Sequence, residues 1–351
     1  MRALRFYDNH DIRVEDIDEP QVRPGTAKIE VAYCGICGSD LHEYLDGPIF
    51  TPTQDTPHSL SGEKAPITMG HEFSGVISEL GEGTEGLEVG DHVVVEPYYV
   101  CGHCPQCERG DYHLCNEMGF IGLAGSGGMT KFAVVEQRWI HKIDKSVPLD
   151  EAALIEPLTV AYHAVQRSGV KAGETAIVSG AGPIGQLTTA VLKGIGVTVI
   201  VSELAEARKA KVKDLADYVV DPSQEDLAAR VTEITGGKGA DVGFDAAGVN
   251  ATINALLNVV RPGGVIVMEA IWGKKAELDM HALVTREIDL RGTIGYVSNH
   301  PDTIKLVESG AIKLAPFITG RIKIDEVVDK GFDTLINHAD TAVKILVDPK
   351  A

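Results

Sequence analysis

The sequence predicts an α/β protein with two domains, a β-rich domain first and a doubly wound parallel-sheet domain after it. Its 351 residues are long for one domain and comfortable for two. Short alternating or apolar runs, separated by Gly, Pro and Asp, fill roughly the first 150 residues. From about residue 174 to 295, strand patterns alternate with helix patterns, which is typical of a parallel sheet with helices on both faces.

The β-rich domain is expected to span residues 1–155. Its predicted strands alternate in polarity or are continuously apolar, and turn sequences such as GEGTEGLEVGD separate them. These strands cover 27–33, 73–80, 92–95 and 132–135.

The parallel-sheet domain is expected to span residues 156–295. Helical spacing over 151–170 ends at Gly169 and leads into it. The strands expected after it cover 175–180, 197–203, 218–220, 242–248 and 265–270, and the helices cover 183–196, 204–214, 224–236 and 252–264.

The last segment, 296–351, is short for a domain of its own. It contains two helical patterns, 302–309 and 325–336, and a final strand, 344–348. We therefore expect it to return and complete the first domain.

Composition excludes several functional classes. The net charge of −19 argues against nucleic-acid and anionic-membrane partners, because phosphate binding needs a basic surface. The first 18 residues have no apolar signal-peptide core, and no apolar run approaches the ~18 residues that span a bilayer. We expect a cytoplasmic protein whose six cysteines are thiols or metal ligands rather than disulfides.

The sequence GAGPIG at 180–185 predicts a dinucleotide site. It follows a predicted strand and opens a predicted helix. The first glycine permits the tight turn, the second lets the backbone approach the pyrophosphate, and the third lets helix and strand pack closely. The helix N-terminus then offers amides and positive dipole to the phosphates. The candidate cofactor-binding residues are Gly180, Gly182, Pro183, Ile184, Gly185, Glu203 and Arg208.

Glu203 favours NAD over NADP. It ends the next predicted strand, where a carboxylate can accept hydrogen bonds from the ribose hydroxyls and would repel a 2′-phosphate. Arg208 could instead bind a phosphate, flank the adenine or pair with Glu203. The alternative is an ordinary glycine-rich turn in which Glu203 only caps a helix.

Four cysteines within 15 residues predict a closed structural zinc site. Tetrahedral zinc suits four thiolates with no open position. An iron–sulfur cluster is a competing interpretation, but the C-P ending and a second cysteine set are missing. Ordinary thiols are the other alternative, and His103 inside this loop is interpreted as a bystander. The predicted ligands are Cys101, Cys104, Cys107 and Cys115.

A third group has mixed sulfur, nitrogen and oxygen donors. It comprises Cys37, the pair His71–Glu72, and Glu156 on a predicted helix. Each alone would read as structural or solvated. Together, beside a dinucleotide fold, they indicate a catalytic zinc with an exchangeable position. Cys34 forms a CxxC with Cys37 and could suggest a redox pair, although a small buried residue is the preferred interpretation.

These motifs give the chain a resemblance to the medium-chain, zinc-dependent alcohol dehydrogenase family. They spread over nearly the whole chain in the order found in that family. The matching segments are CGICGSDLH (34–42), GHEFSG (70–75), GDHVVVEP (90–97), the four-cysteine loop, EPLTVAYHA (156–164), SGAGPIG (179–185) and RPGG (261–264).

The resemblance implies a GroES-like catalytic domain over 1–155, completed by 296–351, and a Rossmann domain over 156–295. It implies that Cys37 and His71 bind the catalytic zinc, with Glu72 and Glu156 as alternating or water-linked ligands. Two zincs per chain and NAD are then expected, with hydride passing between the cofactor and an alcohol carbon.

The resemblance also implies a route for the proton. Ser39 matches the hydroxyl that accepts the proton of the substrate, and His42 matches the histidine that passes it to solvent. The alternative is that Ser39 and His42 only cap a turn and a helix.

The stretch 47–69 bears on the substrate. It is longer than the corresponding stretch of sorbitol dehydrogenases and resembles that of (R,R)-2,3-butanediol dehydrogenases, which also act on acetoin and diacetyl. A sorbitol-like polyol or threonine dehydrogenase is one alternative, and a zinc-free NAD(P)H-binding protein is another. The resemblance further implies a homodimer or homotetramer joined through strands near 265–271 and 289–294.

Overall fold

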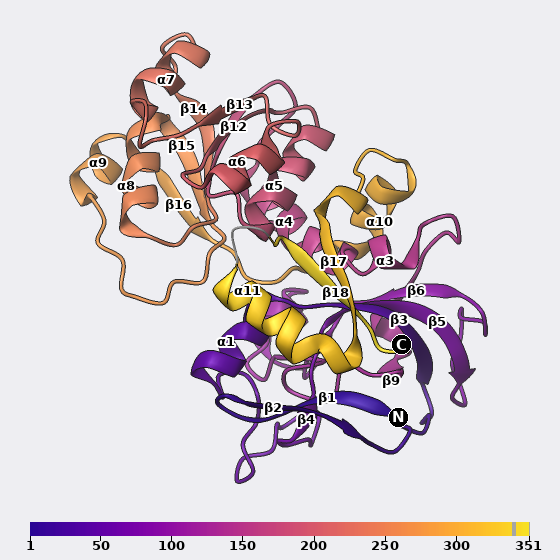
Figure 1. The fold of residues 1–351 in the computed structure, drawn as a ribbon. Coiled ribbons are helices and arrows are strands. Elements are labelled where there is room, and N and C mark those ends of the chain that lie inside the picture. The colour runs from indigo at the N-terminus through magenta and orange to yellow at the C-terminus, as the bar shows by residue number, and fades with distance from the viewer. Residues whose placement is uncertain (339–341, 351) are drawn as a thin grey trace. The chain divides into compact units, whose positions relative to one another are not determined.

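The computed structural model describes residues 1–338 and 342–350. It divides into two compact units, Met1–Glu156 with His300–Ala351, and Pro157–Asn299 (Figure 1). The expected boundaries differ slightly, because they placed Glu156 in the second domain and 296–299 in the first. Helix α4 (Ile155–Ser168) runs through the first boundary without a break, so no turn sequence marks it.

The first unit is built on a seven-stranded sheet. Its central pair, β3 and β5, is antiparallel and contains the two segments, 27–33 and 73–80, that the sequence predicts as strands. The strand order is β10-β6-β5-β3-β18-β17, with β9 also paired to β3. The strands are β3 (Thr26–Gly35), β5 (Glu72–Leu80), β6 (His92–Val95), β9 (Phe132–Glu136), β10 (Ile140–Lys142), β17 (Ile318–Lys323) and β18 (Lys344–Asp348).

Smaller elements complete the first unit. The two N-terminal strands form a small sheet in the order β2-β1-β4, and β7 pairs with β8 on either side of the four-cysteine loop in the sequence. Their bounds are β1 (Arg2–Asp8), β2 (Asp11–Asp16), β4 (Ile67–Thr68), β7 (Tyr98–Tyr99) and β8 (Gly119–Phe120). The helices are α1 (Gly38–Asp46), α2 (Pro105–Glu108), α3 (Leu149–Ala152) and α10 (His300–Glu308), with short 3₁₀ turns η1 (Tyr112–Leu114), η2 (Gln137–Trp139) and η3 (Ala315–Phe317).

The C-terminal segment returns to this unit. Strand β18 pairs antiparallel with β3, placing Leu346 opposite Gly35 and Val347 opposite Cys34. The single helix expected over 325–336 was wrong in type. The structure has a 3₁₀ turn η4 (Ile324–Glu326), a π-helix η5 (Val327–Phe332) and a short α11 (Asp333–Asn337). The spacing of apolar residues is similar in these three helix types, so it does not distinguish them.

The second unit is a six-stranded parallel sheet in the order β13-β12-β11-β14-β15-β16. Apolar runs predict five of these strands, because both faces of such a sheet are covered, whereas the short and mostly exposed β16 is not predicted by such a run. The strands are β11 (Thr175–Ser179), β12 (Thr198–Ser202), β13 (Tyr218–Val220), β14 (Ala240–Asp245), β15 (Val260–Met268) and β16 (Asp289–Gly292).

Helices lie on both faces of this sheet, with α5 and α8 on opposite sides in Figure 1. They are α5 (Pro183–Gly194), α6 (Glu206–Val212), α7 (Leu227–Ile234), α8 (Asn250–Val259) and α9 (Met280–Thr285). The predicted helix 252–264 was too long, because α8 ends at Val259 and Val260 already pairs with Ala240 as the start of β15. Within the described residues, no helix is long and apolar enough to cross a membrane.

Candidate metal and dinucleotide sites

Pairing of β3 with β5 brings the mixed-donor residues together. Cys34 lies opposite Phe73 and Gly35 opposite Glu72, so the segment after β3 meets the segment before β5. As a result Cys37, at the N-cap of α1, lies with His71 and Glu72 in a group whose ligand atoms are all within 4.8 Å of one another. Cys37 is half-buried and the other two are buried.

Lys344, which sequence reasoning missed, forms a buried ion pair with the carboxylate of Glu72. Lys344 Nζ donates to both oxygens of Glu72 at 2.7 Å and to the carbonyl of Ile36 at 3.2 Å. The side chains of Lys344 and Glu72 are only 5% and 0% exposed. Burial opposes the charge of Lys344, but Glu72 and Cys37 outweigh it and raise its pKa. A side chain at Gly35 would collide with Glu72, because its Cβ would lie 2.2 Å from Oε2.

His71 is oriented from both sides. Its Nε2 lies 3.2 Å from Ser39 Oγ, and its Nδ1 lies 3.7 Å from Asp40 Oδ1. Burial opposes the charged ring, but Asp40 and Cys37 raise the pKa of His71 well above its ordinary value. Burial raises the pKa of Asp40 to about 6, and its other oxygen accepts from Cys37 N at 2.8 Å. A carboxylate behind a ligating histidine fixes its tautomer and orientation, so Asp40 is a second residue that sequence reasoning missed.

Glu156 and His42 lie at the margin of this arrangement. Glu156 is 6% exposed and outside the 4.8 Å group, although its charge helps raise the pKa values of His71 and Lys344. His42 is one turn beyond Ser39 on α1, half exposed, with Nδ1 3.7 Å from Asp46. The structure therefore gathers three of the four expected catalytic-zinc residues and places His42 near solvent.

The four-cysteine loop closes on itself. Its four sulfurs lie within 4.8 Å of one another, and none of the six cysteines forms a disulfide, as expected. Backbone amides point at the sulfurs, with Cys101 N donating to Cys115 and Cys104 N donating to Cys101, both at 3.3 Å. Backbone hydrogen bonds from Asn116 and Cys107 lower the pKa of Cys104 to about 6. This geometry is suited to a thiolate-bound metal.

The glycine motif forms a tight turn between β11 and α5. Gly180 has φ +98, and a Cβ at Gly185 would lie 2.0 Å from the carbonyl oxygen of Gly180. Gly182 caps α5, and Pro183 is its first residue. Within the described residues, the amides of Ile184 and Gly185 have no protein acceptor. Such amides at a helix N-terminus are suited to phosphate oxygens.

Glu203 directly follows β12 beside this turn and is 8% exposed. Its carboxylate accepts from the amides of Ala181 at 2.7 Å and of Leu204 and Ala205 at 2.8 Å. It therefore stabilises the glycine turn and the start of the next helix, with acceptor capacity left for a further donor. Arg208 lies half-buried on α6, and among the described residues no ion pair joins it to Glu203.

A third cluster of possible ligands lies elsewhere in the first unit. Glu96 accepts from His141 Nε2 at 2.8 Å and from the hydroxyl of Tyr112 at 2.5 Å, and His300 Nδ1 lies 3.8 Å away. The two imidazoles are stacked 4.8 Å apart with planes 9° from parallel. Parallel stacked rings cannot both direct an in-plane nitrogen at one ion. We therefore interpret the cluster as a structural hydrogen-bonded group.

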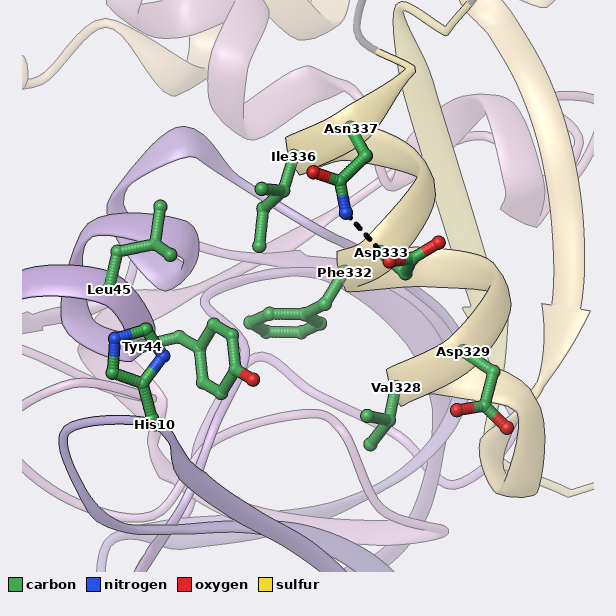
Figure 2. Close-up of a pocket in the computed structure, with 9 residues that line it drawn as sticks. All are labelled: His10, Tyr44, Leu45, Val328, Asp329, Phe332, Asp333, Ile336 and Asn337. Atoms are coloured by element: carbon green, nitrogen blue, oxygen red, sulfur yellow. Dashed lines mark hydrogen bonds between the residues drawn. The ribbon is translucent and has the colours of Figure 1, made fainter.

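A pocket of about 410 Å³ opens between the β1–β2 turn, the end of α1 and the η5–α11 segment. Figure 2 shows the ring of Tyr44 between His10 and Phe332, and their ring centroids lie 5.1 Å and 5.7 Å from that of Tyr44. None of the candidate metal ligands lines it. The pocket is therefore separate from the mixed-donor group.

The stretch 47–69 is tied down at both ends. Glu43 on α1 is fully buried and accepts from the amides of Ile49 at 3.0 Å and Phe50 at 2.5 Å. Glu63 accepts from Ser126 Oγ at 2.6 Å. Phe50 then makes an edge contact with Phe120 at 6.2 Å between centroids, and Phe120 lies 6.4 Å from the ring of His71. The stretch thus supplies one apolar ring that contacts Phe120, the ring beside His71.

Two domain families match this chain. Residues 23–145 match the alcohol dehydrogenase GroES-like domain, and residues 183–309 match the zinc-binding dehydrogenase domain. A GroES-like domain with a parallel-sheet dinucleotide domain defines the class, and the expected fold is confirmed. The chain belongs to the zinc-binding alcohol dehydrogenase family, and it is an oxidoreductase.

Within this family, the chain is similar over its full length to butanediol dehydrogenases. The chain is 51% identical over 352 residues to an (R,R)-butanediol dehydrogenase of Neisseria gonorrhoeae, covering 99% of each. The crystal structure of 2R,3R-butanediol dehydrogenase from Bacillus subtilis superposes with a TM-score of 0.94 at 42% identity, covering 99% of each chain. Two similar structures hold cofactors, with 99% of each chain covered. A protein from E. coli CFT073 binds NADH (28% identity, TM-score 0.87), and one from Sinorhizobium meliloti 1021 binds NADP (29%, 0.86).

Proposed function

We propose that this protein is a zinc- and NAD-dependent dehydrogenase that interconverts (2R,3R)-2,3-butanediol and acetoin, and that it also reduces diacetyl. The main support for the substrate assignment is the 51% identity over the full length to an (R,R)-butanediol dehydrogenase. The apolar ring of Phe120 beside His71, with Phe50 packed against it, supports this assignment, because apolar rings suit the methyl groups of this diol better than the hydroxyls of a polyol.

The donor set fits a catalytic zinc. One sulfur, one imidazole nitrogen and carboxylate oxygens are the ligand types of catalytic zinc sites, and Asp40 orients the imidazole. Cys37 and His71 would hold the metal, with the third protein ligand from Glu72 or Glu156. Lys344 holds Glu72 in the present conformation. The four-cysteine loop would hold a second, structural zinc.

The glycine turn fits a dinucleotide, with the free amides of Ile184 and Gly185 directed to the pyrophosphate. We assign NAD rather than NADP because the carboxylate of Glu203 would repel a 2′-phosphate. The half-buried Arg208 makes no ion pair with Glu203 and would flank the adenine. Measured affinities for the two cofactors test this, and tighter binding of NADP would reverse the assignment.

Zinc would supply a Lewis acid that lowers the pKa of the substrate hydroxyl, and NAD would accept the hydride. Ser39, whose oxygen lies 3.2 Å from His71 Nε2, accepts the proton of that hydroxyl and at the same time gives up its own hydroxyl proton toward His42. His42, half exposed one turn further along α1, releases the proton to solvent. Phe50 and Phe120 limit the access of water and position the carbon skeleton.

The substrate assignment is tested by NADH formation with the three 2,3-butanediol stereoisomers, sorbitol and threonine. Turnover selective for the (2R,3R) isomer supports the proposal. Faster turnover of sorbitol or threonine would retain the metal chemistry and discard the diol assignment.

Replacing Ser39 with alanine is expected to lower kcat by roughly 100-fold or more, because proton transfer by a positioned group is worth that much. NADH binding, measured by fluorescence titration, should change less than about twofold. Ser39→Thr, which keeps the hydroxyl, is the matched control and should retain more activity. Normal turnover of Ser39→Ala would remove Ser39 from the proton route.

The edge of the second unit supports a homo-oligomer. Strand β16 is an edge strand, and exposed apolar side chains gather on it and on α9, including Met280 (56% exposed), Val284 (66%) and Leu290 (38%). We expect a homodimer formed through this edge. Val284→Lys should shift the mass measured by light scattering toward the monomer, whereas a monomeric wild-type protein would contradict the assignment.

The six unpaired cysteines also favour a reducing compartment, which we take to be the cytoplasm. Cell fractionation with an activity assay tests this, and activity confined to another compartment would contradict it.

A further inference from the structure

The strand order of the parallel sheet predicts where each half of the dinucleotide binds. The strand order reverses between β11 and β14, and ligands of such sheets bind at the carboxyl ends of the strands at that point. The glycine turn and Glu203 take the side of β11 and β12 for the pyrophosphate and adenosine. The nicotinamide half is then left for the ends of β14 and β15, an argument that rests on the proposed NAD function.

A carboxyl group stands at this position. Glu269 directly follows β15, and its amide donates to the carbonyl of Asp245, the last residue of β14, at 3.0 Å. Both carboxyl oxygens of Glu269 accept from the hydroxyl of Thr188, at 3.1 Å and 2.9 Å. Thr188 is one helical turn after Ile184 on α5, so the two share a face of the helix. The Glu269 carboxyl thus lies one turn below the helix end assigned to the cofactor.

Glu269 is half-buried, and among the described residues its carboxyl group has no basic partner, its hydrogen-bond donor being the hydroxyl of Thr188. Asp245, by contrast, is well satisfied, since it accepts from Thr252 Oγ1 at 2.8 Å and from Trp272 Nε1 at 3.2 Å. The charged group acting on Glu269 is Asp245, and α5 presents only the uncharged Thr188. Burial, together with the negative charge of Asp245 and against the hydrogen bond from Thr188, raises the pKa of Glu269 to about 8.

We propose that Glu269 is a positioning residue for the nicotinamide half of the cofactor, whose ionised form favours the cationic NAD⁺ ring and whose neutral form favours NADH. If Glu269 only held Thr188 in place, its ionisation would not change the relative affinities for NAD⁺ and NADH. Coupling between a protonation site and a ligand is reciprocal, so NAD⁺ binding should release a proton from Glu269 near pH 8. Binding of NAD⁺ lowers the pKa of Glu269, because the positive nicotinamide ring stabilises the carboxylate.

The test is the ratio of dissociation constants, Kd(NADH)/Kd(NAD⁺), for the zinc-loaded protein from pH 6.5 to 9.5. NADH is titrated by fluorescence and NAD⁺ by competition against it. In the wild type the ratio should rise about tenfold or more as Glu269 ionises, since two charges several ångströms apart inside a protein interact by more than 1 kcal/mol. In Glu269→Gln this rise should be lost.

Glu233→Gln is the matched control, since it removes one negative charge from a side chain that is 70% exposed on α7 and should keep the wild-type profile. Thr188→Val is a second variant. It removes the donor that favours the ionised form, so the rise should move to higher pH. An unchanged profile in both Glu269→Gln and Thr188→Val would overturn the inference. A wild-type protein that binds neither NADH nor NAD⁺ would instead reject the proposed function.

Discussion

Replacing Lys344 with methionine should lower the free energy of unfolding by about 3–5 kcal/mol, because removal of one partner leaves a charge buried without compensation. Lys344 donates to both oxygens of Glu72 at 2.7 Å, and neither side chain is more than 5% exposed. The backbone carbonyl of Ile36 also loses its donor. Urea denaturation followed by circular dichroism measures the change.

Two controls separate this ion pair from a general effect of lysine or arginine removal. Arg321→Met removes the partner of Asp150 from a side chain that is 46% exposed and should cost no more than about 1 kcal/mol. Glu72→Gln combined with Lys344→Met should recover most of the lost stability, because the stranded charge is gone. A Lys344→Met protein as stable as Arg321→Met would show that the buried pair contributes little.

Replacing Cys37 with serine should lower kcat/KM by about a thousandfold, equivalent to about 4 kcal/mol of transition-state stabilisation. A serine hydroxyl is a poor zinc ligand at neutral pH, so the site at Cys37 and His71 should also lose its metal. Steady-state NADH formation and the zinc content per chain measure the two effects.

Cys34→Ala is the matched control, because Cys34 is fully buried, lies outside the group of Cys37, His71 and Glu72, and belongs to the same CxxC. Burial raises its thiol pKa, as expected for a packing residue rather than a reactive thiolate. It should keep both zinc and activity. Loss of activity in Cys34→Ala with full activity in Cys37→Ser would exchange the roles assigned to the two cysteines.

Much of the second unit could be predicted from local pattern. Buried parallel strands are short apolar runs, and helices α5, α6 and α7 end within two residues of a Gly or Asp, so the sequence indicates most of these elements. The error at 252–264 arose where Val259 and Val260 suit either structure, and only the pairing of Val260 with Ala240 decides for a strand. The π-helix at Val327–Phe332 has no signal that separates it from an α-helix.

The candidate site was predictable in its ligands and not in their surroundings. Cys37, His71 and Glu72 carry donor types that zinc prefers, so chemistry alone points to them. Lys344 lies in a C-terminal strand, where a lysine normally faces solvent, and only the pairing of β18 with β3 brings it to Glu72. Asp40 could have been found, because it stands three residues after Cys37, the spacing at which a side chain hydrogen-bonds the N-cap amide.

The central claim is that Cys37 and His71 hold a zinc on which alcohol oxidation depends. The most direct measurement is zinc content together with NADH formation from (2R,3R)-2,3-butanediol, before chelation, after chelation and after zinc is restored. We expect two zincs per chain in the active protein, loss of turnover as the catalytic zinc is removed, and recovery on its return. Full turnover in zinc-free protein would contradict it.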